Sequence, residues 1–342
     1  MTGDGRDTWH RVAAADELVG DGPIQVLVAG ERWVVGRLDG DLAAARDLCP
    51  HRLAPLSAGC VVDNTFQCPY HGYRFDGTGR CVEIPSMPLG PIPEKACISA
   101  YEVTEQYGLV WIRLDDRAGT VIPAHPAYDD EAMKIVHGVP YTWPVGAPRR
   151  VENFVDLAHF AWVHDGSLGR RDEPVPPLPT IIRESGELRF AFDPPEMEVD
   201  DTALFGHSEY RMPMPLTVSI EFWLAGGAKR HLWMTACPID MATTRTFWTV
   251  SRNDDVDGDD APHMAFQALV LAEDEPVVCN QDPPELHLEP GFELSVRTDR
   301  VSIEYRRWLG QIAAAAATGP DEVAAIVAAS NAPRLADVGA PA

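Results

Sequence analysis

The stretch Cys49–Asp76, CPHRLAPLSAGCVVDNTFQCPYHGYRFD, contains two Cys-His pairs in the order C-x-H-x16-C-x-x-H. Cys49 and His51 form the first pair, and Cys68 and His71 form the second. A zinc finger would instead group cysteine with cysteine and histidine with histidine at a different spacing. The order therefore indicates a metal centre with thiolates on one side and imidazoles on the other.

The interleaved order fits an iron–sulfur centre of the Rieske type. Thiolates and imidazoles together select zinc, copper or iron–sulfur. In a Rieske centre two cysteines hold one iron and two histidines hold the other. Pro50 and Pro69 stiffen the two loops, and Gly72 permits a tight turn after His71. A structural Cys2His2 zinc site remains the alternative at this point.

Short apolar runs separated by turn residues surround these loops and predict an all-β domain. Gly-Glu and Asp-Gly-Asp separate the earlier runs, as expected of hairpins. We assign residues 1–118 to this domain. The predicted strands are Ile24–Gly30, Arg32–Leu38, Leu42–Cys49 and Gly108–Leu114.

Composition excludes several classes of protein. The 342 residues carry a net charge of −24, which argues against nucleic acid or an anionic membrane as a partner. No apolar run is long enough to span a bilayer, and the first residues lack the apolar core of a signal peptide. Seven cysteines without a disulfide rhythm indicate a reducing, cytoplasmic location.

Residues 119–342 predict a second domain of the α+β class. The fold we expect is helix-grip-like, an antiparallel sheet with helices packed on it. Asp260-Ala261-Pro262 predicts the start of a helix that runs to about Glu273. The predicted strands are Thr217–Ala225, Lys229–Pro238 and Thr243–Arg252, and the other predicted helices are Arg149–His164 and Val301–Ala329.

A second group of metal-binding residue types lies in the first of these helices, ENFVDLAHFAWVH. Asn153, Asp156 and His159 are spaced i, i+3, i+6 and would share one helix face. His164 follows His159 by five residues, about 140° round an ideal helix. The helix must therefore end or carry a bulge between the two histidines if both bind one metal. Two histidines and one carboxylate form the iron(II) site of non-haem oxygenases.

Together these motifs resemble the Rieske non-haem iron oxygenases, the ring-hydroxylating and demethylating family. CPHR…CPYHGYRFDGTGRC is similar to the cluster domain, and N-x-x-D-x-x-H-x4-H is similar to the mononuclear iron motif. The length and single chain resemble the homotrimeric monooxygenase and O-demethylase branch. Respiratory Rieske proteins, which carry an extra disulfide between the loops, are less similar.

The resemblance implies a role for each residue of the two motifs. Cys49 and Cys68 would bind one cluster iron and His51 and His71 the other, while His159 and His164 would bind the mononuclear iron. Asp156 would bridge the two metals, across a subunit interface in a homotrimer, and Asn153 would lie near the iron. Asp274 matches the third ligand best, with Glu273 and Glu275 as rivals.

The resemblance also implies the reaction. A [2Fe-2S] cluster passes electrons to Fe(II), which uses O2 to hydroxylate a small aromatic, alicyclic or alkaloid-like molecule. Hydroxylation next to oxygen or nitrogen removes a methyl group as formaldehyde. Electrons would come from NAD(P)H through a separate reductase or ferredoxin, since the chain lacks a G-x-G-x-x-G motif after a strand. The alternatives are a cis-dihydroxylating dioxygenase and a Rieske electron carrier without catalysis.

The substrate pocket is less marked in the sequence. On the strand Lys229–Pro238, His231, Trp233 and Thr235 share one face and are candidates for the pocket lining, as is Trp223 on the opposite face. Aromatic residues in such strands are more often part of the core.

Overall fold

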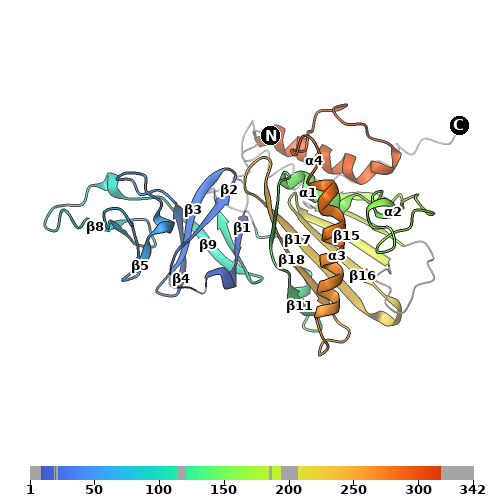
Figure 1. The fold of residues 1–342 in the computed structure, drawn as a ribbon, viewed down its shortest axis with the longest axis horizontal. Helices are drawn as coiled ribbons and strands as arrows, with labels where there is room; N and C mark the ends of the chain where they lie inside the picture. Colours follow the sequence, from blue (N-terminus) through green and yellow to red (C-terminus); the bar gives the residue numbers. More distant parts are fainter. Residues whose placement is uncertain are drawn as a thin grey trace. The chain divides into compact units, whose positions relative to one another are not determined.

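The computed structural model describes residues 9–18, 20, 22–114, 121–184, 187–193 and 207–316. The chain forms two compact units that divide between Ile122 and Pro123 (Figure 1). The predicted domain boundary after residue 118 lies outside the described residues, as does the part of the expected last helix beyond residue 316. None of the described helices is long and apolar enough to cross a lipid bilayer.

The first unit contains a six-stranded sheet in the order β1-β10-β9-β4-β3-β2. Two-residue turns with positive φ, Ala29-Gly30 and Asp39-Gly40, join β2 to β3 and β3 to β4. Such turns match the twist of a hairpin, which explains the regular pairing of these strands. The strands are β1 (Trp9–Ala14), β2 (Ile24–Val28), β3 (Glu31–Leu38), β4 (Asp41–Arg46), β9 (Ala100–Gln106) and β10 (Leu109–Arg113).

A four-stranded sheet in the same unit carries the two Cys-His loops. Its order is β5-β6-β7-β8, and Asp63-Asn64, both with positive φ, form the first hairpin turn. Phe66 and Phe75 lie in its fully buried core together with both cluster cysteines. The strands are β5 (Cys60–Val62), β6 (Thr65–Gln67), β7 (Arg74–Phe75) and β8 (Cys81–Glu83).

The second unit is built on an antiparallel sheet of eight strands, so the predicted α+β class is confirmed. Seven strands follow the order β11-β18-β17-β16-β15-β14-β13, and β12 pairs with β18. The strands are β11 (Lys134–His137), β12 (Tyr141–Trp143), β13 (Ile181–Glu184), β14 (Glu187–Phe192), β15 (His207–Met214), β16 (Thr217–Trp223), β17 (Lys229–Pro238) and β18 (Thr244–Arg252).

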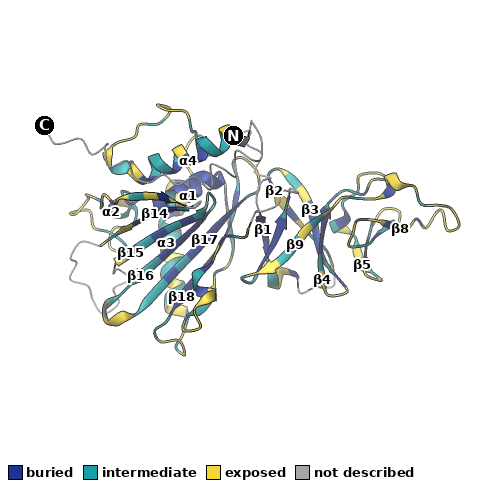
Figure 2. Ribbon diagram, turned by 180° about the vertical axis from the view of Figure 1, so that it is seen from behind, coloured by how far each residue is buried: buried dark blue, intermediate teal, exposed yellow. Residues whose placement is uncertain are grey.

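Helices cover one face of this sheet. In Figure 1 α3 crosses in front of the strands, and in the reverse view of Figure 2 it lies behind them. Val151 of α1 and Tyr305 of α4 belong to the same buried core cluster as Met234 and Ala236 of β17. The helices are α1 (Ala147–Val155), α2 (Phe160–Val163), α3 (Ala261–Val278) and α4 (Arg300–Ala316).

Candidate metal centres

Each Cys-His loop closes on its own cysteine through backbone hydrogen bonds. The Leu53 amide donates to the Cys49 carbonyl at 2.8 Å, and the Gly72 amide donates to the Cys68 carbonyl at 3.1 Å. Gly72 has φ of +71°, and a Cβ there would lie 3.1 Å from Pro85. The predicted tight turn after the second pair is therefore present and favours glycine.

The two loops bring their four metal-binding residues together. The Cys49 and Cys68 thiols are buried and lie close enough to share a hydrogen bond. The His51 and His71 rings have centroids 4.5 Å apart, and the Tyr73 ring stacks on His51 at 4.8 Å. The thiols and the imidazoles thus lie on separate sides, as the sequence predicted, and the structure adds that the thiols lie inside and the imidazoles toward the surface.

The chemistry of this donor set fits a Rieske cluster. Burial raises the pKa of the Cys49 thiol to about 11, so its thiolate needs a nearby positive charge such as iron. Among the described atoms, the buried Nδ1 of His51 has no hydrogen-bond partner and is available as a ligand. Cys60 and Cys81, outside the motifs, contact Gln67 and the Glu83 carbonyl instead.

The second group converges on a single point in the other unit. The Nε2 atoms of His159 and His164 are 3.2 Å apart. Oδ1 of Asp274 lies 3.5 Å from the first and 3.3 Å from the second. Three ligand atoms of two histidines and one carboxylate so close together match the donor set of a non-haem iron(II) site.

The helix predicted over Arg149–His164, with an end or a bulge between the two histidines, is interrupted at a different place. Helix α1 ends at Val155, and the Asp156 carboxylate accepts a hydrogen bond from the Ala158 amide at 2.9 Å. This Asx-type turn competes with the helix and redirects the chain. His159 and His164 then flank the single turn α2, so their rings meet although five residues separate them. The interruption precedes both histidines instead of lying between them.

The three candidate acids on helix α3 point in different directions. It continues to Val278, past the predicted end at Glu273, and successive side chains differ by about 100°. Asp274 is buried beside the histidines, whereas Glu275 is exposed. Glu273 reaches the other nitrogen of His164. The structure therefore brings only Asp274, of these three, to the point where the histidine Nε2 atoms meet.

Asn153 and Asp156 also lie at this site. The amide Nδ2 of Asn153 donates to Oδ1 of Asp274 at 3.1 Å and lies 3.5 Å from Nε2 of His159. Oδ2 of Asp156 lies 3.6 Å from Nδ1 of His159, on the side of the ring away from Asp274. All the residues predicted for the second centre are thus within one small region.

Three side chains at this site were not predicted in these roles. Glu273, a rival ligand in the sequence, accepts hydrogen bonds from His164 Nδ1 at 2.8 Å and from the Ser167 hydroxyl at 2.7 Å. Arg150 donates to the side-chain amide oxygen Oδ1 of Asn153. Its place three residues before Asn153 was a helical-spacing signal, whereas nothing in the sequence singled out Ser167.

The site's electrostatics favour a charged carboxylate. Burial opposes ionisation of Asp274, but the hydrogen bond from His164 and the charge of Arg150 lower the pKa of Asp274 below its usual value. Burial likewise opposes a charged His164, but Asp274 and Glu273 raise the pKa of its imidazole. A cluster of one buried carboxylate and two imidazoles is suited to a divalent cation.

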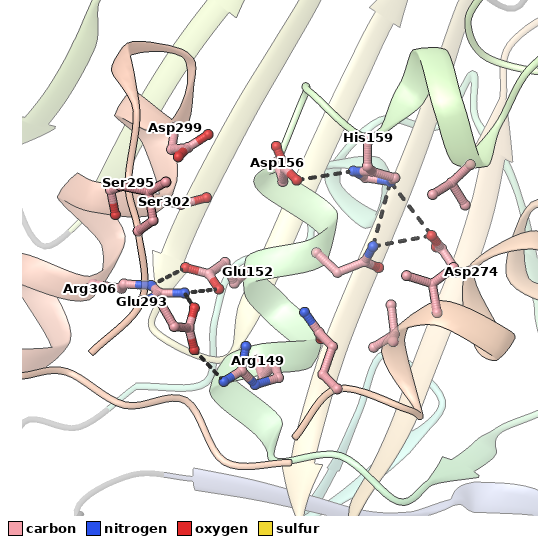
Figure 3. Close-up of a pocket in the computed structure, with 16 residues that line it drawn as sticks. Arg149, Glu152, Asp156, His159, Asp274, Glu293, Ser295, Asp299, Ser302 and Arg306 are labelled. Carbon is pink, nitrogen blue, oxygen red and sulfur yellow. Dashed lines mark hydrogen bonds and ion pairs between the residues drawn. The ribbon is translucent and has the colours of Figure 1, made fainter. Parts of the chain in front are cut away.

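A cavity of about 260 Å³ opens beside Asp156 and His159 (Figure 3). Its opposite wall is a four-residue ion-pair network. Glu293 joins Arg149 and Arg306, each at 2.6 Å, and Arg306 also binds Glu152. The network ties α1 to α4 and gives the cavity a polar wall across from the carboxylate of Asp156.

The suggested pocket face of β17 is part of the core instead. His231 and Trp233 are buried, and neither lines the cavity. Nε2 of His231 lies 2.8 Å from the Ser219 hydroxyl, and the Trp233 indole donates to the Ala124 carbonyl at 3.1 Å. These residues point away from Met234, which packs against the helices.

Each of the two units matches a known protein family. Residues 8–99 match the Rieske [2Fe-2S] domain family, and residues 144–315 match the vanillate O-demethylase oxygenase C-terminal domain. The chain is 40% identical to methylxanthine N1-demethylase NdmA of Pseudomonas putida over 90% of this chain and 89% of the relative. It is 38% identical to methylxanthine N3-demethylase NdmB of the same species over 92% and 91%.

A solved structure agrees along nearly the whole chain. A solved structure of Pseudomonas putida CBB5 NdmA with caffeine superposes with a TM-score of 0.90 at 38% identity. The match covers 95% of this chain and 96% of the other. A match of this coverage extends across both units.

Proposed function

The chain belongs to the Rieske non-haem iron oxygenases, and within this family we propose that it removes N-methyl groups from a small heterocyclic substrate. Family membership confirms the predicted oxidoreductase class, a terminal monooxygenase component that takes electrons from a separate reductase. It also confirms the predicted cofactor class, a Rieske cluster with non-haem iron. The proposal of N-demethylation is supported by the two N-demethylase relatives, which align over about nine-tenths of both chains.

We assign the cluster ligands to Cys49, Cys68, His51 and His71. The supporting observations are the two buried thiols and the adjacent imidazoles, one with an unpaired buried Nδ1. When bound, the cluster supplies single electrons and the mononuclear iron activates O2.

We assign the mononuclear iron to His159, His164 and Asp274. Three converging ligand atoms support this assignment. The Glu273 carboxylate accepts a hydrogen bond from the Nδ1–H of His164, which fixes the proton on Nδ1 and leaves the Nε2 lone pair free for metal. Asn153 orients the Asp274 carboxylate through its amide.

Asp156 is the proposed electron bridge to the cluster of a partner subunit in a homotrimer. One carboxylate oxygen is held by the Ala158 amide, and the other faces His159 at the edge of the cavity. A carboxylate in this place can accept a hydrogen bond from an imidazole on each side and fix both tautomers. The polar wall of Arg149, Glu293 and Arg306 would then lie against the partner.

The proposed reaction inserts one oxygen atom into a C–H bond of an N-methyl group. The N-methyl substrate, O2, two electrons and two protons give the demethylated amine, formaldehyde and water. The protein's contribution is to place the methyl group near the three ligands and to keep bulk water away. We also propose a cytoplasmic location, because the cluster requires its cysteines as reduced thiols.

Reductase-coupled turnover tests this function. Purified protein is supplied with NADH, a surrogate reductase and a panel of N-methylated purines, O-methylated aromatics and unsubstituted aromatics. We expect one formaldehyde per demethylated product, with N-methyl purines preferred. A cis-diol carrying both oxygen atoms would overturn the proposal and favour dihydroxylation. A preference for O-methyl aromatics would support a demethylase but would contradict the proposed class of N-methyl substrates.

A further inference from the structure

Arg150 is a buried cation that the reaction described above does not use. It lies on α1, three residues before Asn153, and its side chain is fully buried. A guanidinium removed from water is costly unless its donors and its charge are satisfied. Its surroundings therefore indicate what it does.

The guanidinium sits among three aromatic rings. It lies 4.6 Å from the Trp143 ring and 4.1 Å from the Phe154 ring, within the range of cation–π contact. Nε and Nη2 donate to the Tyr141 hydroxyl at 3.0 and 2.7 Å. These contacts fix the plane of the guanidinium and leave Nη1 pointing at Asn153.

The direction of the hydrogen bonds decides how the Asn153 amide is turned. Arginine can only donate, so Nη1 must face the amide oxygen of Asn153. The ionised Asp274 carboxylate can only accept, so it must face the amide nitrogen, and that contact is 3.1 Å. Both neighbours require the same orientation of the Asn153 amide. The hydrogen bonds therefore run in one direction, from Arg150 to Asn153 and from Asn153 to Asp274.

Uncharged side chains hold the Arg150 guanidinium. None of the described carboxylates forms an ion pair with it; its hydrogen bonds go to Tyr141 and Asn153. The Asn153 amide is therefore the link between the Arg150 guanidinium and the Asp274 carboxylate.

We propose that Arg150 is a positioning residue of the mononuclear iron site, which locks the Asn153 amide and through it the Asp274 carboxylate. This inference rests on the proposed iron ligands. Loss of this hydrogen-bonded restraint changes none of the three ligand residues, but it lets the Asp274 carboxylate turn away from the metal position. Lysine at position 150 keeps the charge among the aromatic rings, but one ammonium cannot reproduce the planar fork.

A double-mutant cycle on metal affinity tests the proposal at constant charge. Arg150→Lys, Asn153→Ala and the double variant are purified with an intact cluster, stripped of mononuclear metal and titrated with Co(II). We expect each single variant to bind Co(II) about tenfold more weakly than the wild type, the range expected for outer partners of metal ligands. The double variant should be no weaker than Asn153→Ala alone, because Arg150 acts through Asn153.

The controls separate this inference from the proposed site itself. His159→Ala should abolish the Co(II) band of the wild type, and its persistence would reject the site. Unchanged affinity in Arg150→Lys, or losses that multiply in the double variant, would overturn the role of Arg150 while leaving the site intact. The cluster absorbance and the thermal midpoint report folding. A Co(II) spectrum altered in Arg150→Lys at an unchanged midpoint would support positioning over a merely structural role.

Discussion

The two proposed metal centres are assembled in different ways. The four cluster residues lie within 23 positions, from Cys49 to His71, on two loops of one small sheet. The mononuclear site joins the segment around His159 to Asp274, more than a hundred residues away on α3. The first centre depends on local turns, and the second depends on packing across a domain. Changes at the two centres should therefore have separable effects.

The largest expected effect is loss of turnover with the cluster retained. His159→Ala removes one of three ligands and should reduce formaldehyde formation at least about a thousand-fold. The visible cluster spectrum should stay unchanged, because the cluster loops belong to another unit. A formaldehyde assay measures the loss of turnover, and visible absorbance of the same sample measures the cluster. Loss of the cluster absorbance in His159→Ala would contradict the independence of the two centres.

The reciprocal change tests independence in the other direction. Cys68→Ser should abolish the cluster spectrum and all reductase-dependent turnover, since a buried hydroxyl replaces a ligand thiolate. Co(II) titration should still find the mononuclear site at close to wild-type affinity. Cys60→Ser, at an exposed cysteine outside the motifs, is the matched control and should keep the cluster. Loss of Co(II) binding in Cys68→Ser would show that the centres fold together.

A smaller effect is expected at the partner of His164. Glu273→Gln keeps an acceptor for Nδ1 but removes the charge, and should weaken Co(II) binding about tenfold. Glu275→Gln, its exposed neighbour on the same helix, should bind like the wild type. Equal losses in both variants would point to the general acidity of the segment instead of a specific contact.

The smallest effect distinguishes the two units by their acid stability. Burial lowers the pKa of His125 to about 2, beside His231 with a pKa of about 4, and both lie in the catalytic unit. The unfolded chain takes up protons below about pH 6.5, whereas folded His125 does not. Stability is thus complete above that pH and falls by about 1.4 kcal/mol per unit below it for each such group.

Chemical unfolding between pH 7 and pH 5 measures this effect. The catalytic unit should lose stability before the cluster unit, whose His51 and His71 lie toward the surface. His125→Gln should flatten the pH dependence, because glutamine does not titrate there. A catalytic unit as stable at pH 5 as at pH 7 would contradict the assignment of a buried neutral histidine.

The two centres also show what a sequence reveals. The cluster loops are readable because the spacing and turn residues that bind metal are contiguous, and Gly72 adopts the predicted turn. The break after Val155 was missed, because composition alone favours a helix through Asp156, whose carboxylate instead caps a turn. Only the direction of side chains on α3 separates Asp274 from Glu273, and that follows from packing far along the chain.

The role of Arg150 could not be predicted from the sequence either. The sequence places it one helical turn before Asn153, but the rings that hold it come partly from β12, a strand that precedes the helix. Its role follows only from the direction of its hydrogen bonds. Local spacing identifies metal ligands, whereas the residues that orient them are found through three-dimensional contacts.

Iron and acid-labile sulfide per chain, measured in parallel on anaerobically purified wild type and His159→Ala, test the central claim most directly. We predict about three irons and two sulfides in the wild type, and about two irons with the same two sulfides in the variant. That result would establish two separate iron centres and place one of them at His159. Equal iron in both proteins, or zinc without sulfide, would contradict the account.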